Sequence, residues 1–249
     1  MLLFNLLIFG FGLIVGSFLN CVIYRLEIGK SFLGGHSFCP YCKHELVWHD
    51  LIPVFSFLML KGKCRYCQKP ISIQYPLIEL TTAILFVLVF NSQNLLNTGY
   101  LLLTTSFLII IFVYDLKHYI IPDKVIFPAI LTSFLFLFTT NSLLLNTVLS
   151  AFGASFFFLL IYLISQGQWM GFGDVKLSFL MGLHLGFPNI LVALFSAFFT
   201  GAIIGLILIA QNKKTLKSIV PFGPFLVFGT FLAMFYGELI INWYCNLFL

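Results

Sequence analysis

The sequence predicts an all-α, polytopic integral membrane protein of about eight transmembrane helices with one small soluble segment. Charged residues make up 8% of the 249 positions, 32 residues are Phe, and the mean hydropathy is +1.07. A soluble domain of this size needs a far larger charged fraction on its surface. The apolar runs are continuous and lack the two-residue period of membrane β-strands. Most of the chain must therefore face lipid or other apolar helices.

A helix needs about 20 apolar residues to cross the hydrocarbon core. The first apolar run is followed, not preceded, by its basic residues Arg25 and Lys30, which is the opposite of a secretory signal, so it is expected to stay as a helix. The run at 174–187 is the shortest and stops before Pro188. The predicted spans are approximately 1–25, 72–91, 98–114, 124–141, 143–165, 174–187, 188–210 and 219–245. They give three parts: a first helix (1–26), a soluble segment (27–71) and a multi-helix membrane domain (72–249).

The basic residues predict the orientation, because Lys and Arg are enriched in cytoplasmic loops. All 13 lie in or beside the segments that face one side of an eight-span arrangement. The amino terminus is therefore expected outside and residue 26 onward in the cytoplasm. Seven spans would place the cluster of Lys213, Lys214 and Lys217 outside, so the charges favour eight. The net charge of +5 then reflects topology, and a nucleic-acid partner is not expected because the basic residues form no helical stripe. The cytoplasmic segments are 26–71, 115–123, the turn before 174, and 211–218.

Four of the six cysteines form two Cys-x-x-Cys pairs in the soluble segment, separated by 21 residues, and we call this segment (27–71) the four-cysteine loop. Two such pairs place four thiolates around a tetrahedral Zn²⁺ and leave it no open position for chemistry. A segment of about 45 residues is too small to fold on apolar burial alone, and metal binding can supply the missing stabilisation. Redox thiols or an incidental spacing are the alternatives, while Cys21 and Cys245 are expected to be plain helix residues. The expected ligands of a structural zinc are Cys39, Cys42, Cys64 and Cys67.

Only eight acidic residues exist, so each can be considered. Three of them, Glu27, Glu45 and Asp50, lie in or beside the soluble segment and are expected to be solvated. Glu79 lies near the start of the second predicted helix. A buried ionisable group there is a functional candidate, although helix capping or packing explains it equally well.

The remaining acidic residues of interest are Asp115, Asp123 and Asp174. Asp123 follows Pro122 and is expected to cap the fourth helix. The predicted topology places Asp115 and Asp174 at one membrane face on different helices, where their carboxyls could share one proton. One would then act as base toward a water while the other donates to a scissile carbonyl. The alternative is that both are helix caps at a wet interface.

The neighbours of Asp174 fit a catalytic role. Gly171 and Gly173 precede it and would let bare backbone approach a substrate or another helix. Asp115 ends its own helix and Asp174 begins one, so the helix dipoles predict that Asp174 carries the charge and Asp115 the shared proton. Lys176 is expected to point away from Asp174 and to act as an interfacial anchor, or to meet a lipid phosphate or a substrate carboxylate.

Together these motifs resemble the type IV prepilin leader peptidase and N-methyltransferase family, including its competence and type II secretion members, over nearly the whole chain. Asp115 with Pro122-Asp123 and Gly171-Phe172-Gly173-Asp174 resemble the two aspartate motifs of that family. The other matching segments are Gly16-Ser17-Phe18-Leu19-Asn20, Tyr24-Arg25-Leu26, Cys39-Pro40-Tyr41-Cys42, Asp50-Leu51-Ile52-Pro53, Gly62-Lys63-Cys64-Arg65-Tyr66-Cys67, Ile71-Ser72, Tyr75-Pro76, Glu79-Leu80 and Pro221-Phe222-Gly223-Pro224-Phe225.

The resemblance implies a bifunctional enzyme of the bacterial inner membrane that serves pilus assembly, competence or secretion. It would cleave prepilin or pseudopilin precursors after a glycine at the cytoplasmic face and methylate the new amino terminus with S-adenosylmethionine. Asp115 and Asp174 would be the catalytic aspartates and Asp123 a supporting acid, so that 72–249 carries the protease site. The four-cysteine loop (27–71) would be associated with methyl transfer, because members of the family that lack this loop tend not to methylate. No glycine-rich loop marks where the methyl donor binds. The chain departs from the family at Glu27, where Pro is usual, and at Lys43, where Gly is common.

Two other functions fit the same residues. The first is a protease-only member of the same clan, which would not methylate. The second is a non-catalytic membrane scaffold that uses the four-cysteine loop to dock a cytoplasmic partner. A transporter fits less well, because no ionisable residue lies mid-span on several helices.

Overall fold

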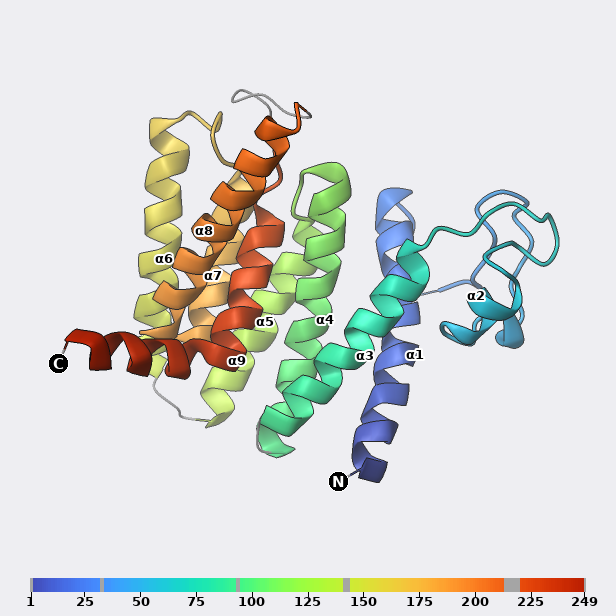
Figure 1. Ribbon diagram of the computed structural model, residues 1–249, viewed down its shortest axis with the longest axis horizontal. Coiled ribbons are helices and arrows are strands. Elements are labelled where there is room, and N and C mark those ends of the chain that lie inside the picture. The colour runs from blue at the N-terminus through green and yellow to red at the C-terminus, as the bar shows by residue number, and fades with distance from the viewer. Residues whose placement is uncertain (1, 32–33, 93–94, 141–143, 213–219, 249) are drawn as a thin grey trace. The chain divides into compact units, whose positions relative to one another are not determined.

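The computed structural model describes residues 2–31, 34–92, 95–140, 144–212 and 220–248 (Figure 1). Within these ranges the regular elements are helices, accompanied by two isolated bridges, Phe38 with Glu45 and Lys63 with Pro70. The all-α class is confirmed. The helices are α1 (Leu2–Glu27), η1 (Trp48–Asp50), α2 (Phe55–Met59), α3 (Gln74–Ser92), α4 (Leu95–His118), α5 (Asp123–Thr140), α6 (Leu144–Ile164), α7 (Phe172–Leu185), α8 (Asn189–Ala210) and α9 (Gly223–Phe248).

Eight of these helices fall on the eight predicted spans. In the described part of the chain, six are long and apolar enough to cross a membrane: α1, α3, α4, α6, α8 and α9. Helix α7 has 14 residues, and at 1.5 Å per residue it is about 21 Å long, shorter than the hydrocarbon core of about 30 Å. The membrane fold is confirmed, and full crossings by α5 and α7, which are not among the six, stay predictions. The cluster Lys213, Lys214 and Lys217, which favours eight spans, lies outside the described residues.

The chain forms two compact units, Met1–Ile110 and Ile111–Leu249. In the first unit α1 packs along α3 through two glycines. A Cβ at Gly12 would lie 2.6 Å from the Cα of Ala83, and one at Gly16 would lie 2.7 Å from the Cα of Glu79. Glycines four residues apart share one helix face, so the two backbones can approach closely. The four-cysteine loop connects the end of α1 to the start of α3.

In the second unit α7 is the central helix and packs against α5, α6, α8 and α9 (Figure 1). Its inner residues, among them Leu177, Met181 and Leu183, are almost completely buried. Gly182 allows it to contact the backbone of α6 at Ala151. Because other helices surround α7, protein rather than lipid covers much of this short element.

Candidate active site and metal centre

Two acidic side chains are buried at helix ends in the second unit. Asp115 lies in the last turn of α4 and is 4% exposed, and Asp174 lies in the first turn of α7 and is 7% exposed. Asp115 is close enough to Asp174 for its charge to act on that carboxyl. The structure therefore brings the two aspartates, 59 positions apart in the sequence, into electrostatic range of each other.

The carboxylate of Asp115 is held by the start of α9. The backbone N–H of Gly223, the first residue of that helix, donates a hydrogen bond to Asp115 Oδ2 at 3.0 Å. The first N–H groups of a helix have no partner within the helix and are free to bind an anion. A Cβ at Gly223 would lie 2.5 Å from the same oxygen. Only glycine fits here without a shift, and sequence reasoning gave Gly223 no role because its partner is on a distant helix.

Asp174 is held by its own helix start. Its Oδ2 accepts a hydrogen bond from the N–H of Gly171, the residue that caps α7, at 3.3 Å. Gly173 has a different role, because a Cβ there would lie 3.0 Å from the Cβ of Ile121 in the turn between α4 and α5. The prediction that Gly173 allows a neighbouring element to approach agrees with this contact, whereas a Cβ at Gly171 would meet only ordinary contacts.

This arrangement removes the basis of the dipole argument about the shared proton. That argument placed Asp115 at the negative end of its own helix and Asp174 at a positive end. In the structure, Asp115 also contacts the positive end of α9 through Gly223. Both carboxylates therefore meet a helix amino terminus, and the helix dipoles no longer favour a charge on Asp174 alone.

Beside the aspartates, Lys176 of α7 forms an ion pair with Asp123, the first residue of α5. The Lys176 ammonium also lies 5.2 Å from the ring centroids of both Phe127 and Phe172. The Asp123 side chain is 60% exposed, so the pair lies at the edge of the buried site. The ammonium of Lys176 is thus directed to Asp123, and it links α7 to α5 rather than acting only as an interfacial anchor.

The four predicted metal ligands come together in the first unit. The sulfur atoms of Cys39, Cys42, Cys64 and Cys67 all lie within 4.8 Å of one another. Zn–S bonds of about 2.3 Å in a tetrahedron place neighbouring sulfurs about 3.8 Å apart. The Cys39 and Cys67 sulfurs are 3.9 Å apart. This set of four thiols therefore fits a tetrahedral metal ion.

The two cysteine pairs adopt the same local fold. The N–H of Cys39 donates to the carbonyl of His44, and the N–H of Cys64 donates to the carbonyl of Lys69. The residue after each pair, Lys43 or Gln68, has a positive φ, 60° and 58° respectively. A left-handed conformation is the one that glycine adopts most easily. The left-handed backbone at this position explains why glycine is common there in the family, and Lys43 adopts the same conformation.

Burial alone would raise the pKa of the Cys39 thiol, but hydrogen bonds from the backbone of Cys42 and Tyr41 outweigh it and lower the pKa to about 7. A lowered pKa increases the thiolate fraction near neutral pH. Because the thiolate is the form that binds a metal, the surroundings of Cys39 favour ligation. At Cys67 a backbone hydrogen bond from Lys69 lowers the pKa, but burial and hydrogen bonds with the other three thiols raise it to about 11, so Cys39 is the thiol that ionises more readily.

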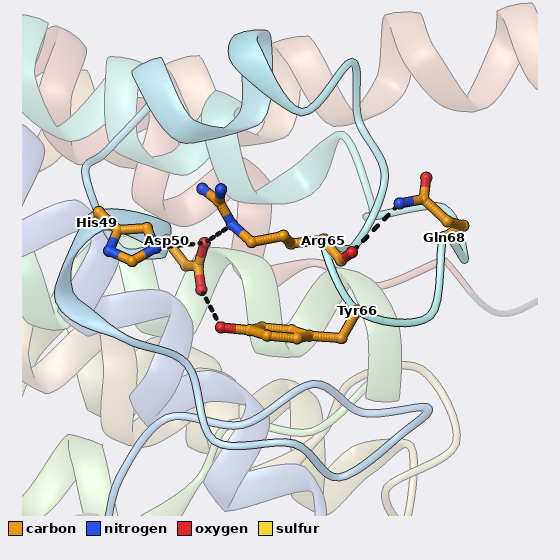
Figure 2. A network of polar contacts seen from close by, with 5 residues as sticks. All are labelled: His49, Asp50, Arg65, Tyr66 and Gln68. Carbon is orange, nitrogen blue, oxygen red and sulfur yellow. Dashed lines mark hydrogen bonds and ion pairs between the residues drawn. The ribbon is translucent and has the colours of Figure 1, made fainter.

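Asp50 ties the middle of the four-cysteine loop to its second cysteine pair (Figure 2). Its carboxylate accepts hydrogen bonds from Arg65 Nε at 2.7 Å and from the Tyr66 hydroxyl at 3.1 Å, and His49 lies beside it. Its side chain is 3% exposed, so the expectation that Asp50 is solvated was wrong. Burial would raise the pKa of Asp50, but the Arg65 and Tyr66 hydrogen bonds and the Arg65 charge lower it.

Glu79 of α3 is also buried, at 6% exposed. Its Oε2 accepts a hydrogen bond from the backbone N–H of Val54 at 2.7 Å, and the Ser17 side chain bonds to it as well. The structure thus favours the packing explanation for Glu79 among residues of the first unit.

Comparisons with known proteins identify the family of the chain. Residues 10–92 match the family described as the bacterial peptidase A24 N-terminal domain, and residues 102–206 match the type IV leader peptidase family. Among the curated proteins, a prepilin leader peptidase/N-methyltransferase of Legionella pneumophila is 32% identical over 94% of this chain and 92% of its own length. Proteins with the same name from Aeromonas hydrophila and Bacillus subtilis are each 32% identical, covering 98% and 97% of this chain and 94% and 98% of their own lengths. No solved structure matches the chain.

Proposed function

Because the chain belongs to the type IV leader peptidase family, we propose that it is a bifunctional enzyme of the bacterial inner membrane. It cleaves the leader from type IV prepilin or pseudopilin precursors and then methylates the new amino terminus with S-adenosylmethionine. The names of the relatives support both activities. The observation that carries the proteolytic half is the burial of Asp115 and Asp174 within range of each other's charge.

In this proposal the aspartates hydrolyse the peptide bond after the glycine that ends the leader. The ionised carboxyl takes a proton from a water molecule, whose oxygen attacks the scissile carbonyl carbon. The protonated carboxyl donates its hydrogen to the carbonyl oxygen as the tetrahedral intermediate forms. Return of a proton to the amide nitrogen then breaks the C–N bond, which leaves a carboxylic acid on the leader and a free amine on the pilin.

The helix ends support this chemistry by fixing the carboxyl groups. The N–H of Gly223 and the N–H of Gly171 each occupy one oxygen of their carboxylate, which leaves the second oxygen of each group for water or substrate. Preorganised donors of this kind need no rearrangement during the reaction. Asp123 and Lys176 are supporting residues, because their ion pair joins the first turns of α5 and α7.

The test is cleavage of a short prepilin in liposomes by Asp115→Asn and Asp174→Asn variants. Each substitution is expected to abolish cleavage, while Glu238→Gln, at an exposed position of α9, should leave it unchanged. Both aspartate variants should still methylate a synthetic pilin that lacks the leader. Normal cleavage by either variant would contradict the proposed pair. Absence of cleavage by the wild type would favour the non-catalytic scaffold.

The methyl-transfer half is assigned to the four-cysteine loop. Cys39, Cys42, Cys64 and Cys67 would hold a structural Zn²⁺. Zinc would supply folding energy to the loop rather than reactivity, since four thiolates leave it no open position. The loop would then shape the region in which the pilin amine meets the methyl donor.

This half is tested with Cys64→Ser/Cys67→Ser and the matched control Cys245→Ser, which changes an exposed thiol outside the cluster. The double variant is expected to fall from one zinc per chain to none and to lose methylation of the synthetic mature pilin. The control should keep both. If the wild type itself does not transfer a methyl group, the protease-only alternative is the correct one.

We also propose that the amino terminus lies outside and that the four-cysteine loop and the aspartates face the cytoplasm, because the Lys and Arg residues lie in the segments assigned to that side. Labelling of intact and permeabilised cells with a membrane-impermeant probe tests this orientation. A reporter cysteine at Asn5 should be labelled in intact cells, whereas one at Lys69 should need permeabilisation.

A further inference from the structure

The four-cysteine loop contains an apolar stretch that neither the metal site nor the aspartates explain. In Leu51–Leu60, eight of ten residues are Leu, Ile, Val, Phe or Met, and none is charged. Asp50 precedes the stretch and Lys61 follows it. An apolar stretch of about ten residues is too short to cross a membrane and is typical of interfacial or re-entrant segments.

This stretch is not folded into a core. It contains the short helix α2, whose Phe55, Leu58 and Met59 are 56%, 66% and 68% exposed. Leu51 and Ile52 are also exposed. A contiguous apolar surface of this kind on a soluble segment is unfavourable in water and indicates a surface that another phase covers.

The position of the stretch in the fold points to lipid as the phase that covers it. The N–H of Val54 bonds to Glu79, which lies five residues after the first residue of α3, or about 7.5 Å along the helix axis. Ser17, which bonds to the same carboxylate, lies ten residues before the end of α1, or about 15 Å. Val54, the residue just before α2, therefore lies at the level of these two membrane helices and not beyond their ends. In the view of Figure 1, α2 likewise lies at a height between the two ends of α1.

The two neighbouring helices also carry exposed apolar side chains. Leu77 on α3 and Phe18 on α1 are 55% and 54% exposed, as expected for side chains on membrane helices that face lipid. Lys61 and Lys63, at the end of the stretch, are exposed cations suited to the headgroup level. The apolar side chains and the two lysines together have the pattern of an amphipathic interfacial element.

The hydrogen bond to Glu79 fits the same environment. A backbone N–H in lipid has no water to bond to and needs a partner from the protein. Val54 precedes the first residue of α2, so its N–H has no acceptor within that helix, and Glu79 supplies the acceptor. The buried Glu79 carboxylate thus provides the acceptor that this N–H would need in lipid.

We infer that Leu51–Leu60 inserts into the lipid leaflet on the side of the four-cysteine loop, with Phe55, Leu58 and Met59 among the acyl chains. The depth expected of an interfacial element is about 5–10 Å. The four-cysteine loop is therefore anchored to the bilayer between its two cysteine pairs and does not extend freely into water. This inference does not depend on the reaction that the protein catalyses.

Fluorescence quenching in liposomes tests the insertion. Tryptophan is placed at position 58 by Leu58→Trp in a protein carrying Trp48→Phe, Trp169→Phe and Trp243→Phe. Lipids brominated near the headgroup end of the acyl chain are expected to quench most of its emission, and aqueous iodide little of it. The matched control is Tyr41→Trp, on the first cysteine pair, which should show the reverse.

Strong quenching by iodide with none by brominated lipid would overturn the inference, because α2 would then face water. Protection from both quenchers would also overturn it, and would show that protein covers the stretch. The unmodified protein provides an independent measurement. A photoactivatable lipid whose reactive group lies on the acyl chain should form adducts within Leu51–Leu60, and their absence would contradict the insertion even if the tryptophan variants misfold.

Discussion

The backbone N–H of Gly223 donates a 3.0 Å hydrogen bond to the carboxylate of Asp115, although 108 residues separate them in the chain. The contact joins the last turn of α4 to the first turn of α9 and leaves no room for a side chain at position 223. A glycine that carries no chemistry of its own therefore fixes one of the two proposed catalytic groups.

Gly223→Ala is expected to lower cleavage on the order of 100-fold, because the added methyl group displaces the Asp115 carboxylate from its donor. The loss should be in kcat, measured with a prepilin peptide in liposomes. Gly205→Ala on α8 is the matched control, since a Cβ there meets nothing within 4 Å. Unchanged cleavage by Gly223→Ala would mean that Asp115 does not need this contact.

Lys176→Ala and Asp123→Ala are each expected to slow cleavage, because the ion pair joins α7 to α5 beside Asp174. The double variant should lose less than the sum of the two single losses, with a coupling of about 0.5–3 kcal/mol in the activation free energy. A swapped pair, Asp123→Lys with Lys176→Asp, should recover part of the rate. Lys124→Ala, which changes the adjacent exposed lysine, serves as the control. Fully additive losses would show that the two residues act independently.

Asp50→Asn is expected to weaken metal binding by the four-cysteine loop about 5- to 160-fold, because it removes the charge that Arg65 and Tyr66 contact, at a cost of about 1–3 kcal/mol. Competition with a chromogenic chelator measures the affinity. The pKa of Asp50 is lowered in the folded loop, so its contribution is complete at neutral pH and is lost only as the pH falls from about 4 through the folded pKa. Glu45→Gln, at an exposed carboxylate in the same loop, should have no effect.

Gly16→Ala is expected to destabilise the pairing of α1 with α3 by about 1–3 kcal/mol, because the new Cβ would lie 2.7 Å from the Cα of Glu79. Thermal unfolding in nanodiscs measures the change. Gly10→Ala lies on the same helix with nothing within 4 Å of the added atom, and should be neutral or slightly stabilising. Equal melting temperatures for the two variants would show that α1 and α3 separate easily.

Sequence composition and spacing predicted the helices and the clustering of the four cysteines well, because both depend on local patterns. A membrane helix is marked by about 20 consecutive apolar residues, and a four-thiolate site by two Cys-x-x-Cys pairs. The proximity of Asp115 and Asp174 followed from topology, since the charge pattern assigned both to one membrane face.

The contacts that hold these groups were not predictable in the same way. Gly223 with Asp115, Lys176 with Asp123 and Glu79 with Val54 each join distant segments, and no periodicity in the chain encodes such pairs. The solvated state expected of Asp50 was wrong for the same reason, because Arg65 and Tyr66 reach it only after the four-cysteine loop has folded.

The close contact of α1 with α3 also affects how the four-cysteine loop unfolds. The helices hold the two ends of a connection of about 45 residues near each other, as a covalent crosslink would. By the relation used for a disulfide, closing a loop of that length removes about 4 kcal/mol of chain entropy from the disordered form. Removal of the metal would then leave a disordered segment whose two ends are still held close together. Such a segment can bind the ion again without any rearrangement of the membrane helices.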